Sequence, residues 1–238
     1  MKQDVVLAAI AIGGSGALAD VTTDFESGAD GWSVSGRDTV AATGNPGNGL
    51  DVQMIDVFGA DLRNSTNSGF LGDLTRYGSA IELSVDVKVN SISSQFSTGE
   101  FSREFIVELR DYDNDNGFPY TSVWYSLGAI NSSTTGEWTT LSVAIDDTSA
   151  TALPIGWGGY GDEDPNTFAP ILPADRTFTS VLQSVDEFAF TTFVPGFFFG
   201  FTDFDLQFDN ISVRAVPAPG ASVALIGGAA VVSRRRRR

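Results

Sequence analysis

The stretch Ile81–Val89, which reads Ile-Glu-Leu-Ser-Val-Asp-Val-Lys-Val, decides the fold class of this chain. Apolar side chains occupy every odd position and polar side chains every even position. Successive side chains of a β-strand point to opposite faces, so this period of two predicts a strand with one buried face and one face in water. No convincing helical period of useful length occurs before the C-terminal tail. We therefore predict an all-β domain built around this strand.

Further candidate strands lie on both sides of this stretch, separated by turn-forming Gly, Asn, Asp and Ser residues. They are 21–26, 32–35, 50–55, 105–109, 122–127, 139–145, 185–193 and 206–213. Many short strands with polar turns in one uninterrupted segment predict an antiparallel β-sandwich of the jelly-roll type over residues 20–214. With 18 Phe and 4 Trp, this segment can bury one sizeable core.

The N-terminal segment 1–19 has the three parts of a secretory signal peptide. Lys2 is followed by an apolar stretch at 5–12, by small residues, and by Ala17-Leu18-Ala19. A positive start, a short apolar run and an Ala-x-Ala site are the features of segments that signal peptidase removes. We expect signal peptidase to cleave after Ala19; a buried first strand is the alternative.

The C-terminal segment 215–238 has an order of features that a soluble domain does not need. It comprises a proline-containing motif at 216–220, an apolar segment at 221–232 and five arginines at 234–238. Even a helix that started at Val216 would span only about 25 Å, slightly less than the hydrocarbon core of a bilayer. The arginines would hold its end on the cytoplasmic side. The segment therefore predicts a short transmembrane helix.

This tail resembles the PEP-CTERM sorting signal, which combines a Val-Pro-Glu-Pro-like motif, a short transmembrane segment and an arginine-rich end. Ala218 stands where that motif has glutamate. The resemblance implies transient membrane insertion and processing by an exosortase-type protease in a Gram-negative-type bacterium, followed by delivery to the cell surface or the extracellular space. The residues at the processing site would be Val216, Pro217, Ala218 and Pro219. A C-terminal membrane anchor that is never cut is the alternative.

The predicted mature domain is strongly acidic. The whole chain has 14 Lys+Arg and 30 Asp+Glu residues, which give a net charge of −16. Without Lys2 and the five terminal arginines 8 basic residues remain, and without Asp4 there are 29 acidic residues, so the net charge becomes −21. Such a domain repels phosphate backbones, which argues against nucleic acid as a partner, and it favours divalent cations such as calcium.

The chain contains no histidine and no cysteine. This composition excludes Ser-His-Asp triads, histidine-based acid–base catalysis, typical zinc sites, disulfides and thiol nucleophiles. Chemistry that uses two carboxylates, as in glycoside hydrolysis, remains available.

Several short motifs occur along the predicted sandwich: Asp24-Phe25-Glu26 with Gly31-Trp32, Gly44-Asn45-Pro46-Gly47, Phe70-Leu71-Gly72-Asp73, Tyr77-Gly78, Val181-Leu182 and Phe208-Asp209-Asn210-Ile211-Ser212-Val213. These segments resemble parts of laminin IV type A (laminin B) domains and of carbohydrate-binding-module jelly rolls. The resemblance implies an extracellular β-sandwich of the adhesive or glycan-binding kind. It implies no catalytic residues.

One group of acidic residues suggests a calcium loop between two predicted strands. Asp111, Asp113 and Asp115 alternate, and carboxylates at every second position can converge on one ion. The EF-hand pattern fails here at its glycine and at its twelfth position. A β-hairpin that turns at Asn116-Gly117 is the favoured alternative.

A second candidate calcium site pairs Glu26, near the start of the domain, with Asp209, near its end. In calcium-containing carbohydrate-binding sandwiches, acidic residues of the first and last strands often meet at a structural ion. An equal alternative is that Asp209 and Asn210 shape a turn before Ile211.

The long insertion 154–173 is the candidate ligand site. Trp157 and Tyr160 lie among glycines, close to Asp162 and Asp164. The rings can stack on a sugar while the carboxylates bind its hydroxyl groups. Loops of this length in compact domains are often functional. The alternative is that the two rings fold back as a lid on the core.

Two function classes agree with these features. The favoured one is a non-catalytic, exported cell-surface or extracellular-matrix protein that binds glycan or another matrix component. The other is a secreted enzyme that degrades polysaccharide with a pair of carboxylates. The small size and the single sandwich favour binding over catalysis.

Overall fold

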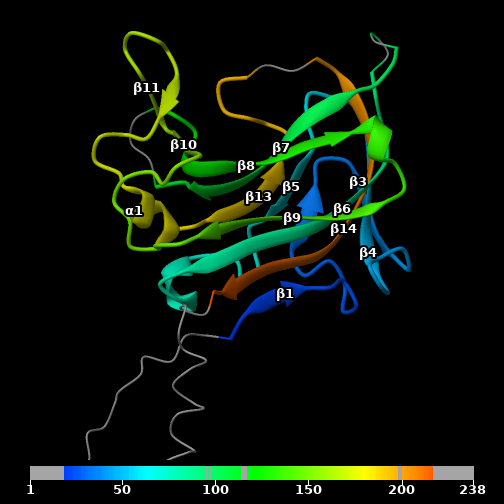
Figure 1. The fold of residues 1–238 in the computed structure, drawn as a ribbon, viewed down its shortest axis with the longest axis horizontal. Helices are drawn as coiled ribbons and strands as arrows, with labels where there is room; N and C mark the ends of the chain where they lie inside the picture. The colour runs from blue at the N-terminus through cyan, green and yellow to red at the C-terminus, as the bar shows by residue number, and fades with distance from the viewer. Residues whose placement is uncertain (1–18, 95, 97, 114–116, 198–199, 217–238) are drawn as a thin grey trace, which may run out of the picture.

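The computed structural model describes residues 19–94, 96, 98–113, 117–197 and 200–216 and shows two antiparallel sheets packed face to face (Figure 1). Sheet A contains β3 (Arg37–Ala41), β4 (Gly49–Val57), β14 (Thr202–Ala215), β6 (Ile81–Ser93) and β9 (Trp138–Ile145) in that order, and β1 (Val21–Thr23) pairs with β14. Sheet B is ordered β10 (Trp157–Tyr160), β8 (Thr121–Asn131), β7 (Ser102–Asp111), β13 (Glu187–Thr191), β5 (Asp61–Asn64) and β2 (Trp32–Val34). The predicted antiparallel β-sandwich is confirmed.

Every strand that the period of two predicts overlaps an observed strand. The sequence analysis missed β3, β5, β10 and the small sheet of β11 (Asp162–Glu163) and β12 (Pro170–Ile171). These strands are short, and β10 reads Trp-Gly-Gly-Tyr, whose glycines have a low strand propensity. They exist because a longer neighbour supplies the hydrogen-bonding partners, as β8 does for β10.

Helical structure is confined to short segments. The single α-helix among the described residues, α1 (Phe178–Leu182), has five residues, and Thr177 and Ser180 close a capping box at its start. Two 3-10 turns occupy Leu74–Tyr77 and Ser132–Thr134. A helix of one turn leaves no periodic signal in a sequence, so the analysis of periods did not detect it.

The central strand β6 departs from its predicted pattern in one respect. Its odd positions 81–89 are buried as predicted, but Ser84 and Asp86 on the supposedly wet face are only 2% and 6% exposed. The Ser84 hydroxyl bonds the Ser212 hydroxyl on β14, and Asn45 donates to Asp86 from a loop that crosses this face. The prediction of a fully wet face was wrong because the 42–48 loop covers the middle of the strand.

Aromatic rings fill the space between the two sheets. Trp32 on β2 meets Phe70 and Phe188 edge to face, with ring centroids 5.1 and 5.7 Å apart. Phe105 lies between Phe190 and Phe208, which come from different sheets, at 6.2 and 6.1 Å. Such pairs add to the burial of large apolar area, so this core holds the sheets together without disulfides.

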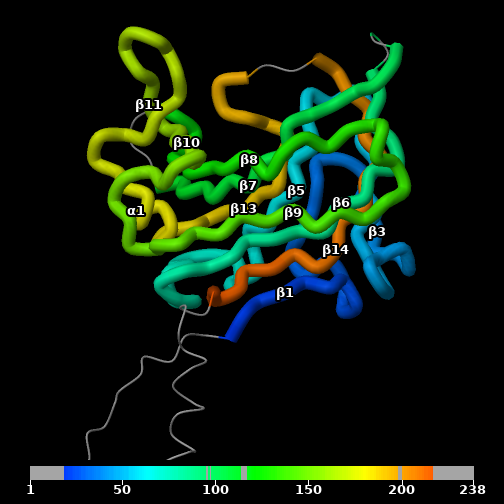
Figure 2. Tube along the Cα trace, in the orientation of Figure 1, coloured from blue at the N-terminus to red at the C-terminus, as the bar shows by residue number. Residues whose placement is uncertain are grey.

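The two ends of the folded domain lie together, as the trace in Figure 2 shows beside β1 and β14. The backbone N–H of Ala215 donates to Asp20 Oδ1 at 2.9 Å. The predicted signal peptide and sorting tail lie outside the described residues, except for Ala19, Ala215 and Val216. Within the part of the chain that the structure describes, no helix is long and apolar enough to cross a membrane.

Candidate functional site

The outer face of sheet B, which points away from sheet A, carries an unusual set of aromatic and charged side chains. The strand register places Trp124 of β8 between Glu108 of β7 and Gly158 of β10. Two residues further along β7, Arg110 lies between Glu187 of β13 and Ser122 of β8. Because side chains two apart share a face, these residues belong to one surface, which we call the Trp124 face.

Arg110 is the centre of a buried charge network on the Trp124 face. Its guanidinium donates to Glu108 Oε2 at 2.8 Å, to Glu187 Oε1 at 2.6 Å and to Asp61 Oδ1 at 3.0 Å. Ser122 donates to the other oxygen of Glu108 at 2.6 Å. Arg110 is 5% exposed and Glu108 is completely buried. A planar guanidinium that is bonded on three sides cannot rotate, so the network fixes the floor of this face.

The network shifts the titration of its members in opposite directions. Burial raises the pKa of the Glu108 carboxyl, although the adjacent guanidinium opposes this. Burial alone would lower the pKa of Arg110, but the carboxylates of Glu108 and Asp61 raise it above its ordinary value. Arg110 therefore stays charged at every relevant pH.

Tyrosines cover the Arg110 network. The guanidinium lies 5.2 Å from the centroid of the Tyr120 ring, and the Tyr112 hydroxyl donates to Glu187 at 3.0 Å. Tyr160 of β10 lies next to Tyr120, with ring centroids 5.1 Å apart. Burial and the Glu187 carboxylate raise the pKa of Tyr112 to about 12. Its hydroxyl therefore remains protonated at neutral pH and acts as a hydrogen-bond donor.

Trp124 forms a flat surface beside this network. Its ring lies so close over Gly158 that a Cβ at that position would overlap the indole. The glycine in β10 thus lets the ring lie flat across the sheet, while the side chain stays partly exposed. The indole Nε1 is buried and has no hydrogen-bond partner among the described residues. Two residues further along β8, Ser126 pairs with Ile106 of β7 and donates a hydrogen bond to the Glu104 carboxylate.

The structure separates the four residues predicted to bind glycan. Trp157 points into the core, is 8% exposed and meets Phe178 edge to face at 5.0 Å. Tyr160 comes from the same strand but reaches the Trp124 face. Asp162 accepts from the backbone of Glu163, and Asp164 accepts from Asn166 and Thr167 at 2.9 Å to close a turn. These backbone bonds lower the pKa of Asp164. Of the four, Tyr160 alone joins this aromatic group.

Asp111 and Asp113 belong to no metal-binding group within the residues that the structure describes. Asp111 is completely buried and pairs with Arg176, and it also accepts from the Asp113 backbone at 2.8 Å. Asp115 lies outside the described residues. Strands β7 and β8 pair antiparallel from Ser102–Asn131 to Asp111–Thr121, which confirms that the two predicted strands pair, while Asn116 of the predicted turn lies outside the described residues.

Glu26 and Asp209 bind the same loop from two sides. Glu26 accepts from the backbone N–H of Asn48 at 2.8 Å, and Asp209 accepts from that of Asn45 at 2.5 Å. Burial raises the pKa of Asp209, against the effect of its backbone hydrogen bonds. Asn210 has a φ of +48° and interrupts the pairing of β14 with β6, as the turn interpretation expects. We call the group of Glu26, Asp86, Asp209 and Asn210, together with the 42–48 loop that they hold, the Asp209 corner.

No group of three or more acidic residues in the described parts of the chain has a geometry that could hold a metal. Calcium binding by Glu26 and Asp209 stays a prediction.

No protein-family model matches the sequence, and no curated protein matches it. The similar solved structures include a Clostridium thermocellum endo-1,4-beta-D-xylanase 10B fragment with a family 22 carbohydrate-binding module, complexed with xylohexaose. It matches at 18% identity and a TM-score of 0.45, and the match covers 83% of this chain and 28% of that one. They also include the second family 22 xylan-binding domain of Paenibacillus barcinonensis Xyn10C, at 12% identity and a TM-score of 0.45, covering 82% and 99%. An exo-beta-agarase matches at 16% identity and a TM-score of 0.46, covering 84% of this chain and 25% of that one. The chain thus spans about a quarter of the xylanase fragment and of the agarase, and nearly all of the xylan-binding domain.

The sequence analysis missed Trp124 and Arg110, which are central to the Trp124 face. A signal was present, because the charged residues Glu108 and Arg110 follow the apolar run 105–107 and flank Leu109. Charged side chains on a buried strand are rare unless paired, so they mark a face where other polar groups must gather.

Proposed function

We propose that this chain is an exported, non-catalytic protein of the cell surface or extracellular matrix that binds glycan on the Trp124 face. The observation that carries the proposal is the Trp124 ring, which lies flat over Gly158 beside the tyrosines that cover Arg110. A partly exposed flat ring offers an apolar surface to the C–H groups of a sugar. Hydroxyl groups held beside it, such as that of Tyr160, can bind sugar hydroxyls and set their orientation.

The rigidity of this face favours binding of a preformed ligand shape. The Arg110 network immobilises charged side chains that would otherwise lose rotamer freedom when a ligand binds. Tyr120 and Tyr160 pack against each other, so their rings are also held before binding. Preorganisation of this kind raises affinity without requiring more contact area.

The same network supports binding rather than hydrolysis. Glycosidases need one carboxyl group as an acid and a second as base or nucleophile on opposite sides of the bond that breaks. Glu108, Glu187 and Asp61 instead all accept from the single guanidinium of Arg110. They are occupied as structural acceptors on the floor of one sheet.

Export and sorting belong to the same proposal. Signal peptidase would cut after Ala19 and an exosortase-type protease near Pro217 to Pro219, after transient insertion of the tail into the membrane. The contact between Asp20 and Ala215 supports this arrangement, because both cuts would fall just outside a closed domain. Mass spectrometry of the mature protein tests it: an intact Arg238 on most of the extracted protein would contradict the sorting step.

Affinity electrophoresis in gels that contain soluble xylan, agarose or mixed-linkage glucan tests glycan binding. We expect at least one polysaccharide to retard the chain, and Trp124→Ala to weaken this by about tenfold or more, as for loss of a central aromatic anchor. Trp138→Ala is the matched control, since Trp138 is a partly exposed tryptophan on sheet A. Unchanged retardation of Trp124→Ala would contradict the site, and release of reducing sugars would contradict the non-catalytic role.

A further inference from the structure

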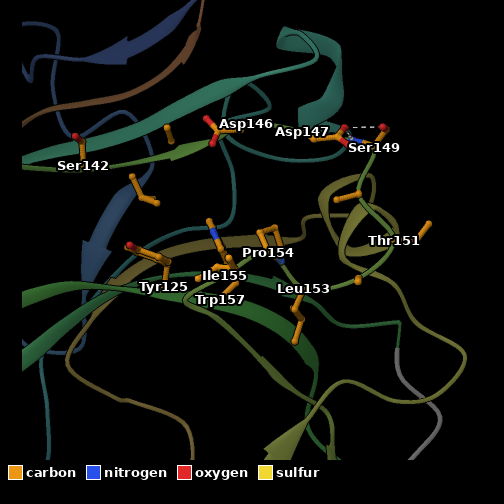
Figure 3. A pocket seen from close by; sticks show the side chains of 14 residues that line it. Tyr125, Ser142, Asp146, Asp147, Ser149, Thr151, Leu153, Pro154, Ile155 and Trp157 are labelled. Atoms are coloured by element: carbon orange, nitrogen blue, oxygen red, sulfur yellow. Dashed lines mark hydrogen bonds between the residues drawn. The ribbon is translucent and has the colours of Figure 1, made fainter.

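A cleft of about 940 Å³ runs between the two sheets on the side opposite β2 and β3. Figure 3 shows its two walls: β9 with Ser142 on one side, and Tyr125 with Trp157 on the other. Ser142, Val143 and Ala144 are consecutive residues whose side chains alternate in direction, yet all three line the cleft. This is possible because the cleft follows the backbone edge of β9 rather than one of its faces.

That edge of β9 is an unpaired strand edge. β9 is the last strand of sheet A and pairs only with β6, over Ile81–Lys88. None of the hydrogen bonds outside the strand ladders involves the backbone of Trp138–Ile145 in the described structure. Every second residue of an edge strand points its N–H and C=O outward, so β9 offers a row of free donors and acceptors along the cleft.

β9 also lacks the features that usually protect strand edges. It has eight residues, Trp-Thr-Thr-Leu-Ser-Val-Ala-Ile, without a charge or a proline. At the other end of sheet A, β3 carries Arg37 and Asp38, and the edge strands of sheet B have three and four residues. Natural proteins block edges with charges, prolines or short strands. A long, uncharged edge without such protection therefore indicates that β9 pairs with a strand of another molecule.

The cleft also presents apolar side chains and one carboxylate that a bound segment could contact. The Ile155 side chain is fully exposed at its rim, and the Trp157 ring lies below with the Tyr125 ring 5.5 Å away. The Asp146 carboxylate binds no other residue that the structure describes, and it follows directly after β9. Glu137 precedes the strand, so both ends of the uncharged edge are acidic.

We propose that β9 binds an extended peptide segment of a partner protein, which adds a strand to sheet A and places alternate side chains in the cleft. The partner segment is uncharged in its centre, with apolar residues at every second position to contact Ile155 and Tyr125. It carries a basic residue at each end, opposite Glu137 and Asp146. The spacing of the free backbone groups matches a peptide and not a sugar chain, which has no donor and acceptor repeat of this period.

The same charges argue against a second copy of this chain as the occupant. Antiparallel pairing of β9 with another β9 in full register would place Glu137 beside Asp146 of the copy at both ends. Like charges directly opposite each other are destabilising in a sheet.

The experiment uses the full chain and a capped decapeptide, Lys-Thr-Val-Thr-Val-Thr-Val-Thr-Val-Lys. Isothermal titration measures binding, and amide hydrogen exchange locates it. We expect slower exchange of the outward amides within 138–145. A peptide of the same side chains with an N-methylated backbone, and one with glutamate at both ends, should each bind at least about tenfold more weakly, because they lack the N–H donors or the basic ends.

Two exposed residues give matched variants that leave the fold intact. Ile155→Ser should weaken binding of the decapeptide, whereas Ile55→Ser, at another highly exposed isoleucine, on β4, should not. Equal binding of the N-methylated peptide, or unchanged exchange in 138–145 at saturating decapeptide, would overturn the proposal. So would protection of 142–144 by soluble xylan and not by the peptide, which indicates a sugar cleft. Protection that rises with protein concentration alone would assign the edge to a second copy.

Discussion

The Arg110 network and the Asp209 corner both bury carboxylates, but they stabilise them in different ways. In the network, one guanidinium on sheet B binds three carboxylates. In the corner, on sheet A, Asp209 is completely buried and Asp86 is 6% exposed. No Lys or Arg side chain binds either of them in the described parts of the chain; amide and hydroxyl groups do.

This difference shows that a carboxylate can be buried by pairing it with a charge or by surrounding it with neutral donors. The first way depends on one arginine held between strands. The second depends on the 42–48 loop, because Asn45 supplies donors to both Asp209 and Asp86. The two centres should therefore respond differently to loss of one cation, to protonation and to added calcium. The following predictions test this contrast.

Removal of the arginine should have the largest effect. Arg110→Met leaves Glu108, Glu187 and Asp61 without their cation, and we expect a loss of about 3–5 kcal/mol of unfolding free energy, as for other broken buried ion pairs. Urea unfolding measures this. The control is Arg63→Met on β5, whose partly exposed side chain lies 3.8 Å from Asp61 and should contribute at most about 1 kcal/mol. Equal losses for the two variants would contradict the central role of Arg110.

Removal of the acceptor in the Asp209 corner should have a smaller effect. Asp209→Ala leaves the backbone N–H groups of Asn45 and Asn210 without an acceptor, and we expect a loss of about 1–3 kcal/mol. Asp205→Ala is the control, because Asp205 lies in the same strand but is less buried and accepts from side-chain amides. If urea unfolding gave the larger loss for Asp205→Ala, the corner would not be the anchor of the 42–48 loop.

Added calcium should stabilise the corner but not the Arg110 network. If Glu26 and Asp209 bind the ion, millimolar calcium should raise the melting temperature, with a gain on the order of 1 kcal/mol for a site of submillimolar affinity. A chelator should reverse the rise, and Asp209→Asn should abolish it. Absence of a rise in the unmodified chain would remove calcium from this protein's cofactors.

Protonation should distinguish the corner in calcium-free solution. The pKa of Asp209 is higher in the folded chain than its ordinary value of 3.8, so the folded state favours the protonated carboxyl. The contribution of this preference to the free energy of unfolding is complete below pH 3.8 and is lost as the pH rises through the folded pKa. Asp209→Asn does not titrate there. Relative to this variant, the unmodified chain should become less stable as pH rises from about 3.8 towards neutrality. A difference that stayed constant with pH would contradict the assignment.

Much of the fold follows from local patterns that a sequence displays. The alternation in 81–89 and the apolar runs of β4, β7, β8 and β14 are visible without knowledge of their neighbours. The pairing of β7 with β8 was also predictable, because turn-forming residues separate two apolar segments, but the ladder ends at Asp111 and Thr121 and a longer connection than a two-residue turn joins them. The strands that were missed, such as β5 and β10, are short and depend on pairing.

The candidate site was far less predictable. Trp124 and Trp157 are both tryptophans in β-strands, and the sequence does not say which one faces the core. The pairing of β10 with β8 decides it: Trp157 aligns with Tyr125 on the inner face, and Gly158 aligns with Trp124 on the outer face. A shift of the register by one residue would exchange the two.

The sequence by itself determined the all-β class, the positions of the central strands and the acidity of the domain, because these depend on residue type and on a period of two. Only the tertiary structure decided that Arg110 gathers three carboxylates, that Asn45 reaches Asp209, and that the edge of β9 stays open. These features join residues that are up to 164 positions apart. Which strands become neighbours depends on how the two sheets pack, and no local pattern records that.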